Sequence, residues 1–190
     1  MGYVANAGVL LVEVIFGLVV ALFVLRVLLQ LVRANFYNPV CQFIYRTSNP
    51  VLAPLRRVVR PIGRFDLTSA LVAWLLECLK VTLLFLLAGF APAFLGVLVL
   101  GLADLLGFVL TLYFWVIIIG VVLSFTGGGN HPLVPLVAQL TAPVLRPFRR
   151  LLPALGGFDL SPLFATLAIL LARLLLVAPL RDFGTFLARG

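Results

Sequence analysis

Charge is scarce in this sequence of 190 residues. Charged residues make up 11% of the chain and apolar residues 64%, whereas a soluble globular domain has about 25% charged and about 45–50% apolar residues. A compact domain of this size cannot cover its surface in water with so few charges. The composition therefore excludes a soluble enzyme, a disordered chain and a secreted disulfide scaffold, and it indicates that the protein lies in lipid.

Histidine, cysteine and acidic residues are also few. The chain has one histidine, two cysteines and six acidic residues, and Cys41 and Cys78 do not form the closely spaced pair of a metal site or disulfide framework. No nucleophile, base and orienting group can be assembled from so few side chains. We therefore expect a protein that is not an enzyme and that holds no metal or cofactor.

Long apolar runs are the main feature of the chain. A helix needs about 20 apolar residues to cross the hydrocarbon core of a bilayer. The runs predict an all-α membrane protein with four transmembrane helices, over residues of about 4–32, 67–89, 102–125 and 160–180. Because Pro92, Gly96 and Gly101 favour a turn, the third helix is expected to begin only near Leu102.

The segments between the first two runs and between the last two resemble each other. Residues 38–67 and 131–160 align without a gap at a constant offset of 93 residues. An apolar bias produces chance matches of leucine and valine, but not of proline, arginine, glycine and aspartate in register. The identical pairs are Pro39/Pro132, Pro50/Pro143, Val51/Val144, Leu52/Leu145, Pro54/Pro147, Arg56/Arg149, Arg57/Arg150, Gly63/Gly156, Phe65/Phe158, Asp66/Asp159 and Leu67/Leu160.

We interpret this pattern as two repeats, residues 1–92 and 93–190, each with a basic amphipathic segment (38–65 or 131–158) between two transmembrane helices. An even number of helices makes the repeats parallel, related by a two-fold axis along the membrane normal. The segments and their flanks then place nine of the 14 cations on one side, and the positive-inside rule predicts that this side is cytoplasmic and both termini periplasmic. These nine are Arg33, Arg46, Arg56, Arg57, Arg60, Arg64, Arg146, Arg149 and Arg150.

Each basic segment is predicted to form two short helices, with the chain restarting at Pro50 or Pro143. After the restart, arginines occupy one face and apolar residues the other, which is typical of a helix lying in the membrane interface. The pattern does not decide between a helix that lies flat and a re-entrant hairpin. The prolines at the restart and four residues later are expected to be structural; they are Pro50, Pro54, Pro143 and Pro147.

An aspartate stands just before the returning helix of each repeat, where Thr68 and Ser161 are the expected helix caps. A carboxylate there can add charge at the helix N-terminus or bind a nearby guanidinium. We expect Asp66 to bind Arg56 or Arg57, and Asp159 to bind Arg149 or Arg150. Two alternatives remain open: the arginines only enforce topology, or the motif binds a lipid phosphate or a protein partner.

The second segment also carries a recognisable motif, made up of Thr141, Pro143, Pro147, Arg149, Arg150, Asp159, Ser161 and Pro162. This pattern resembles the YggT (YlmG) family of small bacterial and plastid membrane proteins, over essentially the whole chain and including a two-copy arrangement. The first repeat departs from it at Asn49 and at Thr68-Ser69. The resemblance implies a bacterial inner-membrane or thylakoid protein linked to osmotic tolerance, to cell division or nucleoid organisation, or to cofactor assembly in plastids, without a settled biochemical activity.

Charged residues inside the apolar runs form a second candidate site, because charges in a membrane are costly and mark function by default. Glu13, Glu77, Lys80 and Arg173 are expected to form a polar cluster between the repeats. Such a cluster suits an ion or proton path. It also suits neutralised pairs that only fix helix packing.

We therefore predict a non-enzymatic organiser, assembly factor or osmotic-stress factor of the bacterial inner membrane, acting through its arginine-rich cytoplasmic segments. Its expected partners are anionic lipid headgroups, with a protein partner or further copies of the chain as other possibilities. The net charge of +8 is assigned to orientation and headgroup contact, not to nucleic acid. The alternative is a small ion transporter or channel component that uses the polar cluster.

Overall fold

The computed structural model describes residues 3–57, 63, 65–125, 132–151 and 159–190. Arg60, Arg64, Gly156 and Phe158 of the repeated segments lie outside these residues. The described chain consists of helices: α1 (Tyr3–Leu31), α2 (Pro39–Leu55), α3 (Leu67–Leu87), α4 (Phe94–Phe125), α5 (Leu133–Leu151), α6 (Ser161–Ala172), a π-helical turn η1 (Arg173–Val177) and α7 (Ala178–Arg189).

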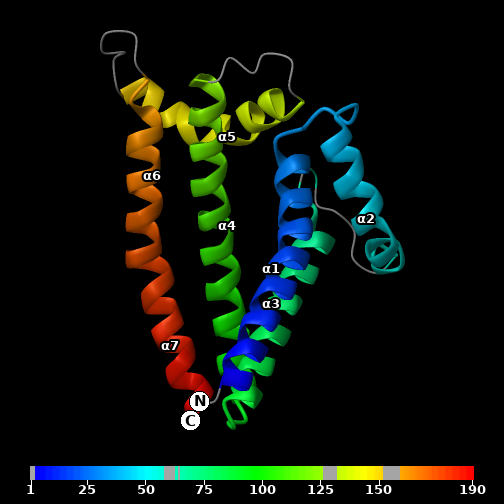
Figure 1. The fold of residues 1–190 in the computed structure, drawn as a ribbon, viewed down its shortest axis with the longest axis vertical. Helices are drawn as coiled ribbons and strands as arrows, with labels where there is room; N and C mark the ends of the chain where they lie inside the picture. Colours follow the sequence, from blue (N-terminus) through cyan, green and yellow to red (C-terminus); the bar gives the residue numbers. More distant parts are fainter. Residues whose placement is uncertain (1–2, 58–62, 64, 126–131, 152–158) are drawn as a thin grey trace.

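Four of these helical stretches are long and apolar enough to cross a membrane, which confirms the predicted fold class. They are Asn6–Leu31, Leu67–Leu87, Phe94–Phe125 and Ser161–Arg189. In Figure 1 they run alongside one another, and both chain termini lie at the lower end. Helix α5 crosses the upper end, while α2 slants down beside α1 and α3. The two-fold relation between the halves stays a prediction from the sequence.

Helix α4 begins at Phe94, eight residues before the expected start. The prediction of a turn at Gly96 and Gly101 is therefore wrong. Both glycines lie inside the helix, where their lack of a side chain permits close packing: a Cβ on Gly96 would collide with the backbone of Ala188, and one on Gly101 with Cys78 Sγ. They bring α7 and α3 against α4.

Helices α2 and α5 each run without a break through two prolines, so the prediction of two short helices per segment is wrong. Proline removes a backbone donor and leaves the carbonyl four residues earlier without its helical partner. Here the prolines are spaced by four residues, which places both defects on one face, and all four side chains are exposed. The freed carbonyls therefore lie on the same outward side of each helix as the prolines.

The fourth membrane-spanning stretch contains the π-helical turn η1. The amide of Ala178 donates to the carbonyl of Arg173, five residues earlier, instead of four. Such a turn inserts one residue into the helical register. Helix α7 continues beyond it to Arg189, further than the predicted end at Leu180.

Helix α5 joins the two main apolar clusters of the bundle. Leu136 and Leu140 pack with a cluster centred on Val24 and Leu28 of α1. One turn further along, Leu145 packs with Ile117 of α4, Ala165 and Ile169 of α6. The basic amphipathic helix is therefore anchored by its apolar face, which leaves its arginines outside.

Candidate functional site

A buried arginine of α1 meets the first repeated segment. The side chain of Arg26 is 1% exposed and that of Asp66 0% exposed, and Arg26 Nε lies 3.3 Å from Asp66 Oδ2. Arg26 also donates to Ser48 Oγ at 2.5 Å, and its guanidinium lies 4.5 Å from the centre of the Tyr45 ring. Arg26 thereby ties the end of α1 to α2 and to the start of α3.

Asp66 accepts hydrogen bonds from at least four donor groups of the described residues. Besides Arg26, it accepts a bond from Arg56 Nη2 at 2.6 Å, from the amide of Ser69 at 3.2 Å and from the hydroxyl of Ser69 at 2.8 Å. Burial alone would raise the pKa of Asp66, but the bonds from Ser69 and the charge of Arg56 outweigh it and lower that pKa. The carboxylate of Asp66 is therefore ionised, and it holds Arg26, Arg56 and Ser69 together in one joint. The predicted bond between Asp66 and the first arginine of its pair is confirmed.

The second repeated segment has a more open version of this joint. Arg149 Nε lies 2.9 Å from Asp159 Oδ2, with side chains 53% and 44% exposed. Asp159 also accepts from the amide of Ser161 at 2.9 Å. Here too burial would raise the carboxyl pKa, and the bonds from Ser161 and Arg149 lower it instead. The predicted pairing with Arg149 is confirmed, and no second arginine reaches Asp159 among the described residues.

The helix caps differ from the prediction. Asp66 itself is the N-cap of α3, and in the second repeat the helix already includes Ser161, whose amide bonds to Asp159. Thr68 and Ser161 are therefore first-turn residues, not caps. A carboxylate accepts a stronger hydrogen bond from these amides than a hydroxyl does, which explains why Asp66 takes the capping role. Leu160 is the N-cap of α6, and Asp159, one residue earlier, accepts the amide of Ser161.

The two arginines of each Arg-Arg pair have different roles. The first, Arg56 or Arg149, bonds to the aspartate. The second, Arg57 or Arg150, is exposed and forms no ion pair within the described chain. Three other arginines near these segments are likewise exposed and unpaired there. We call the whole set the basic face: Arg33, Arg46, Arg57, Arg146 and Arg150.

Glu77 and Lys80 form the predicted i,i+3 ion pair on α3, but their other neighbours differ from the prediction. Lys80 Nζ lies 3.6 Å from Asp104 Oδ2 of α4, and Asp104 Oδ1 lies 2.9 Å from Arg181 Nη2 of α7. Two acids and two bases therefore form a neutral row across three helices. This polar row runs from the buried Glu77 to the exposed Arg181.

Glu13 and Arg173 do not join the polar row. Both side chains are exposed on their helices, and neither forms an ion pair within the described part of the chain. The prediction that they line a common cluster with Glu77 and Lys80 is wrong. Glu13 lies on α1 and Arg173 at the start of η1, whereas the polar row lies on α3, α4 and α7.

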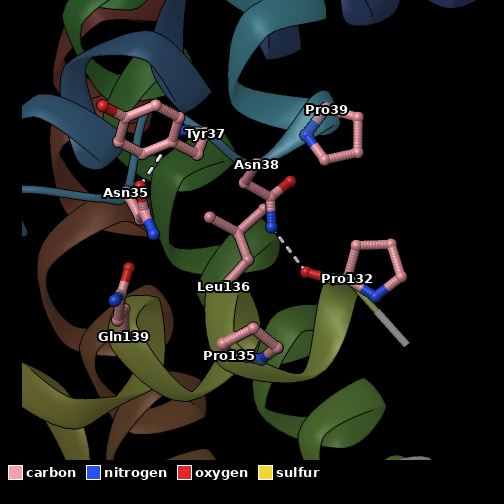
Figure 2. A pocket seen from close by; sticks show the side chains of 8 residues that line it. All are labelled: Asn35, Tyr37, Asn38, Pro39, Pro132, Pro135, Leu136 and Gln139. Atoms are coloured by element: carbon pink, nitrogen blue, oxygen red, sulfur yellow. Dashed lines mark hydrogen bonds between the residues drawn. The ribbon is translucent and has the colours of Figure 1, made fainter. Parts of the chain in front are cut away.

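A small groove lies where the two repeated segments meet. Asn38 caps α2, as the Asn38-Pro39 pair predicts, and its Nδ2 donates to the carbonyl of Pro132 at 2.6 Å. Figure 2 shows this bond beside Leu136 and Gln139 of α5. The residues that line the groove of about 270 Å³ carry no charge. This groove is a junction between the two halves and offers no strong ligand-binding chemistry.

One feature of the sequence points to the buried joint. Arg26 stands alone as a cation in the first apolar run, and an isolated charge in such a run normally has a partner. Asp66, its partner, is 40 residues away. The partners of Asp104, Lys80 and Arg181, are also distant from it in sequence, so only the helix packing reveals these pairs.

Comparisons with known proteins agree on one family. The CCB3/YggT family model matches residues 5–87 and 99–180 of the chain. No solved structure matches it.

Curated relatives cover nearly the full chain. A protein of Escherichia coli K12, described as uncharacterized protein YggT, is 34% identical over 185 residues, 97% of each chain. An uncharacterized Vibrio alginolyticus protein from the proC 3' region is 38% identical over 173 residues, 90% of this chain and 94% of its own. An uncharacterized protein of Pseudomonas aeruginosa is 38% identical over 175 residues, 90% of this chain and 89% of its own.

Proposed function

The chain belongs to the CCB3/YggT family, and we propose that it is a non-enzymatic organiser of the bacterial inner membrane that holds anionic lipid headgroups on its basic face. The different contacts of the two arginines in each Arg-Arg pair support this proposal. Arg56 and Arg149 are occupied by aspartates, whereas Arg57 and Arg150 are exposed and without an ion pair in the described chain. An exposed guanidinium beside an apolar anchor suits a lipid phosphate.

Three of the five arginines of the basic face lie at one end of the membrane-spanning bundle, whereas Arg46 lies on α2 and Arg57 just after it, and α2 slants down beside α1 and α3 (Figure 1). Arg33 follows the end of α1, and α5, which carries Arg146 and Arg150, crosses the same end (Figure 1). Under the positive-inside rule this end is cytoplasmic, and both termini are periplasmic. The face would then lie against the leaflet that attracts basic segments through its anionic lipids, with an attraction of about 1 kcal/mol for each arginine near the surface.

Lipid titration of the purified protein tests the proposal. Phosphatidylglycerol added to the detergent-solubilised protein should raise the melting temperature more than phosphatidylcholine does, and added salt should reduce the difference because it screens exposed charges. The double variant Arg57→Ala with Arg150→Ala should lose a large part of that difference. Its matched control is Arg173→Ala, which removes an exposed arginine from the middle of the fourth membrane-spanning stretch.

The outcome separates lipid binding from topology. Equal effects of the two lipids, or an unchanged preference in the Arg57 and Arg150 variant, would contradict headgroup binding and leave the arginines only a role in orientation. In cells, a strain that lacks the gene should grow poorly after osmotic upshift. Wild-type protein should restore growth and the double variant should not, if the basic face acts in osmotic stress.

The polar row is the observation that favours a second candidate function, that of a small ion transporter. It places four charges on three of the helices that are long and apolar enough to cross a membrane. The row favours packing, however, because every charge in it has an opposite partner and the row is neutral. An ion-flux assay in reconstituted vesicles separates the two functions, and the organiser is expected to give no flux above that of empty vesicles.

A further inference from the structure

A cavity of about 550 Å³ opens beside the second repeated segment, between α4, α5 and the start of α6. Its volume is within the range of about 300–1,000 Å³ that small ligands occupy. Apolar residues such as Ile117, Val137 and Leu145 line most of it. The charged groups that line it are Arg149 and Asp159, the half-exposed ion pair of this repeat.

The first repeat shows how the same joint is completed. There Asp66 binds Arg26 in addition to Arg56 and has no exposed surface. At the offset of 93 residues, the position of Arg26 is held by Ile119, which has no charge. Among the described residues, Asp159 therefore has Arg149 and Ser161 as its donors. A carboxylate can accept about four hydrogen bonds, so Asp159 has capacity left for a cationic donor.

Arg149 also has donors to spare. Its Nε is bound to Asp159, whereas a guanidinium carries about five N–H donors. The site thus offers one acceptor and one donor group side by side, with zero net charge and an apolar cavity next to them. Arg146 and Arg150 are exposed on the same helix but do not line the cavity.

We propose that this cavity binds one phosphatidylethanolamine molecule. The primary ammonium of its headgroup donates to Asp159, its phosphate accepts from the free Nη donors of Arg149, and an acyl chain lies against the apolar lining. The position agrees with this assignment, because the ion pair stands just before the membrane-spanning stretch that begins at Ser161. The basic face of the proposed function selects negatively charged headgroups. The cavity goes beyond that function, because it selects a headgroup that carries a primary ammonium.

Headgroup chemistry distinguishes this lipid from others. Phosphatidylglycerol has no cation for Asp159 and would bring its negative charge against the carboxylate. Phosphatidylcholine has a cation, but its quaternary nitrogen carries no N–H to donate. Since a hydrogen bond to a charged group contributes about 1.5–3 kcal/mol, the primary amine should be preferred over the quaternary amine by roughly tenfold or more.

Native mass spectrometry of the purified full chain tests the site. The protein is mixed with equal amounts of palmitoyl-oleoyl phosphatidylethanolamine, phosphatidylcholine and phosphatidylglycerol, and the retained lipid is identified. We expect one strongly retained phosphatidylethanolamine per chain. The variant Asp159→Asn should lose the preference for this lipid over phosphatidylcholine, while Asp182→Asn, which changes an exposed acid of α7, should keep it.

A second variant tests the apolar part of the site without touching the ion pair. Ala138 is exposed and lines the cavity, so Ala138→Trp should fill it and abolish lipid retention with little effect on melting temperature. Its control is Ala53→Trp on the exposed side of α2. Retention of phosphatidylglycerol or phosphatidylcholine to the same extent, or an unchanged preference in Asp159→Asn, would overturn the proposal. Failure of the basic face to select phosphatidylglycerol would not affect it.

Discussion

Arg26 and Asp66 form an ion pair that is closed to solvent, although 40 residues of sequence separate them. The carboxylate binds a cation from the first membrane-spanning helix and a second one, Arg56, from the end of α2. It also caps α3. A single buried side chain thus connects three helices. Among the described residues, the corresponding Asp159 connects two elements, α5 and α6, and it stays half-exposed.

The two aspartates should therefore differ in their effect on stability. Asparagine caps helices about as well as aspartate does, so Asp66→Asn removes mainly the charge and leaves Arg26 buried without its ionised partner. We expect a loss of about 3–5 kcal/mol. Asp159→Asn should cost about 1 kcal/mol or less, because its partner is exposed. Melting temperatures in one detergent measure both, and similar losses would contradict the difference in burial.

Acid should weaken the Asp66 joint. Its pKa in the folded protein is lowered from the ordinary value of 3.8, so its ionised form contributes stability that is complete above 3.8 and is lost as the pH falls through the lower folded value. As the pH falls below about 3.8, the melting temperature of the wild type should fall. That of Asp66→Asn should fall less. Parallel curves would show that other groups govern acid sensitivity.

The contact between α4 and α7 should not tolerate a larger residue at Gly96. A Cβ there would collide with the backbone of Ala188, which cannot move aside like a flexible side chain. Gly96→Ala should lower stability by about 1–3 kcal/mol, as expected for overpacking. Gly17→Ala is the matched control, because a Cβ at Gly17 would meet nothing within 4 Å. Equal melting temperatures for the two variants would contradict the close approach.

Reporter fusions can read the orientation of the bundle. If the basic face is cytoplasmic, the chain end after α7 is periplasmic, because both termini lie at the opposite end of the bundle (Figure 1). Alkaline phosphatase fused after Gly190 should be active, and green fluorescent protein at the same position should be dark. The reverse result would invert the orientation and place the basic face in the periplasm.

The polar row should matter for stability and not for ion flux. Asp104 is the member that forms ion pairs with both Lys80 and Arg181, so Asp104→Asn should weaken the contact between α3, α4 and α7 by about 1–3 kcal/mol. Vesicles that contain the wild type or the variant should leak ions no faster than empty ones. A wild-type flux that Asp104→Asn abolishes would instead favour the transporter.

The sequence predicts the features that the bilayer and local spacing determine. A membrane-spanning helix must be long and apolar, so the four runs are visible without a structure. The pairing of Arg56 with Asp66, and of Arg149 with Asp159, follows from residues ten positions apart. The start of α4 was missed because glycine in a sequence signals either a turn or a close helix contact, and only the neighbour decides.

Long-range polar contacts were beyond sequence reasoning. Which acid meets Arg26, and which base completes the row at Asp104, depends on how the helices rotate and pack. The continuous course of α2 and α5 through their prolines has the same origin: each helix is stabilised by its buried apolar face, as Leu52 and Leu145 illustrate. Packing of this face overrides the local preference of proline to end a helix.

Because of the π-helical turn Arg173–Val177, the contacts that α7 makes with α4 depend on the number of residues in the turn as well as on their identity. Each residue advances an α-helix by about 100°, so a one-residue deletion in this turn would rotate all that follows by about that angle. Arg181 would then face away from Asp104, and Ala188 away from Gly96. Substitutions in the turn leave the rotation of α7 about its axis unchanged, whereas a deletion or insertion turns its contact face away from α4. Scanning with one-residue insertions and deletions should therefore show a sharp loss of stability at this turn. Scanning with single substitutions should show no such loss there.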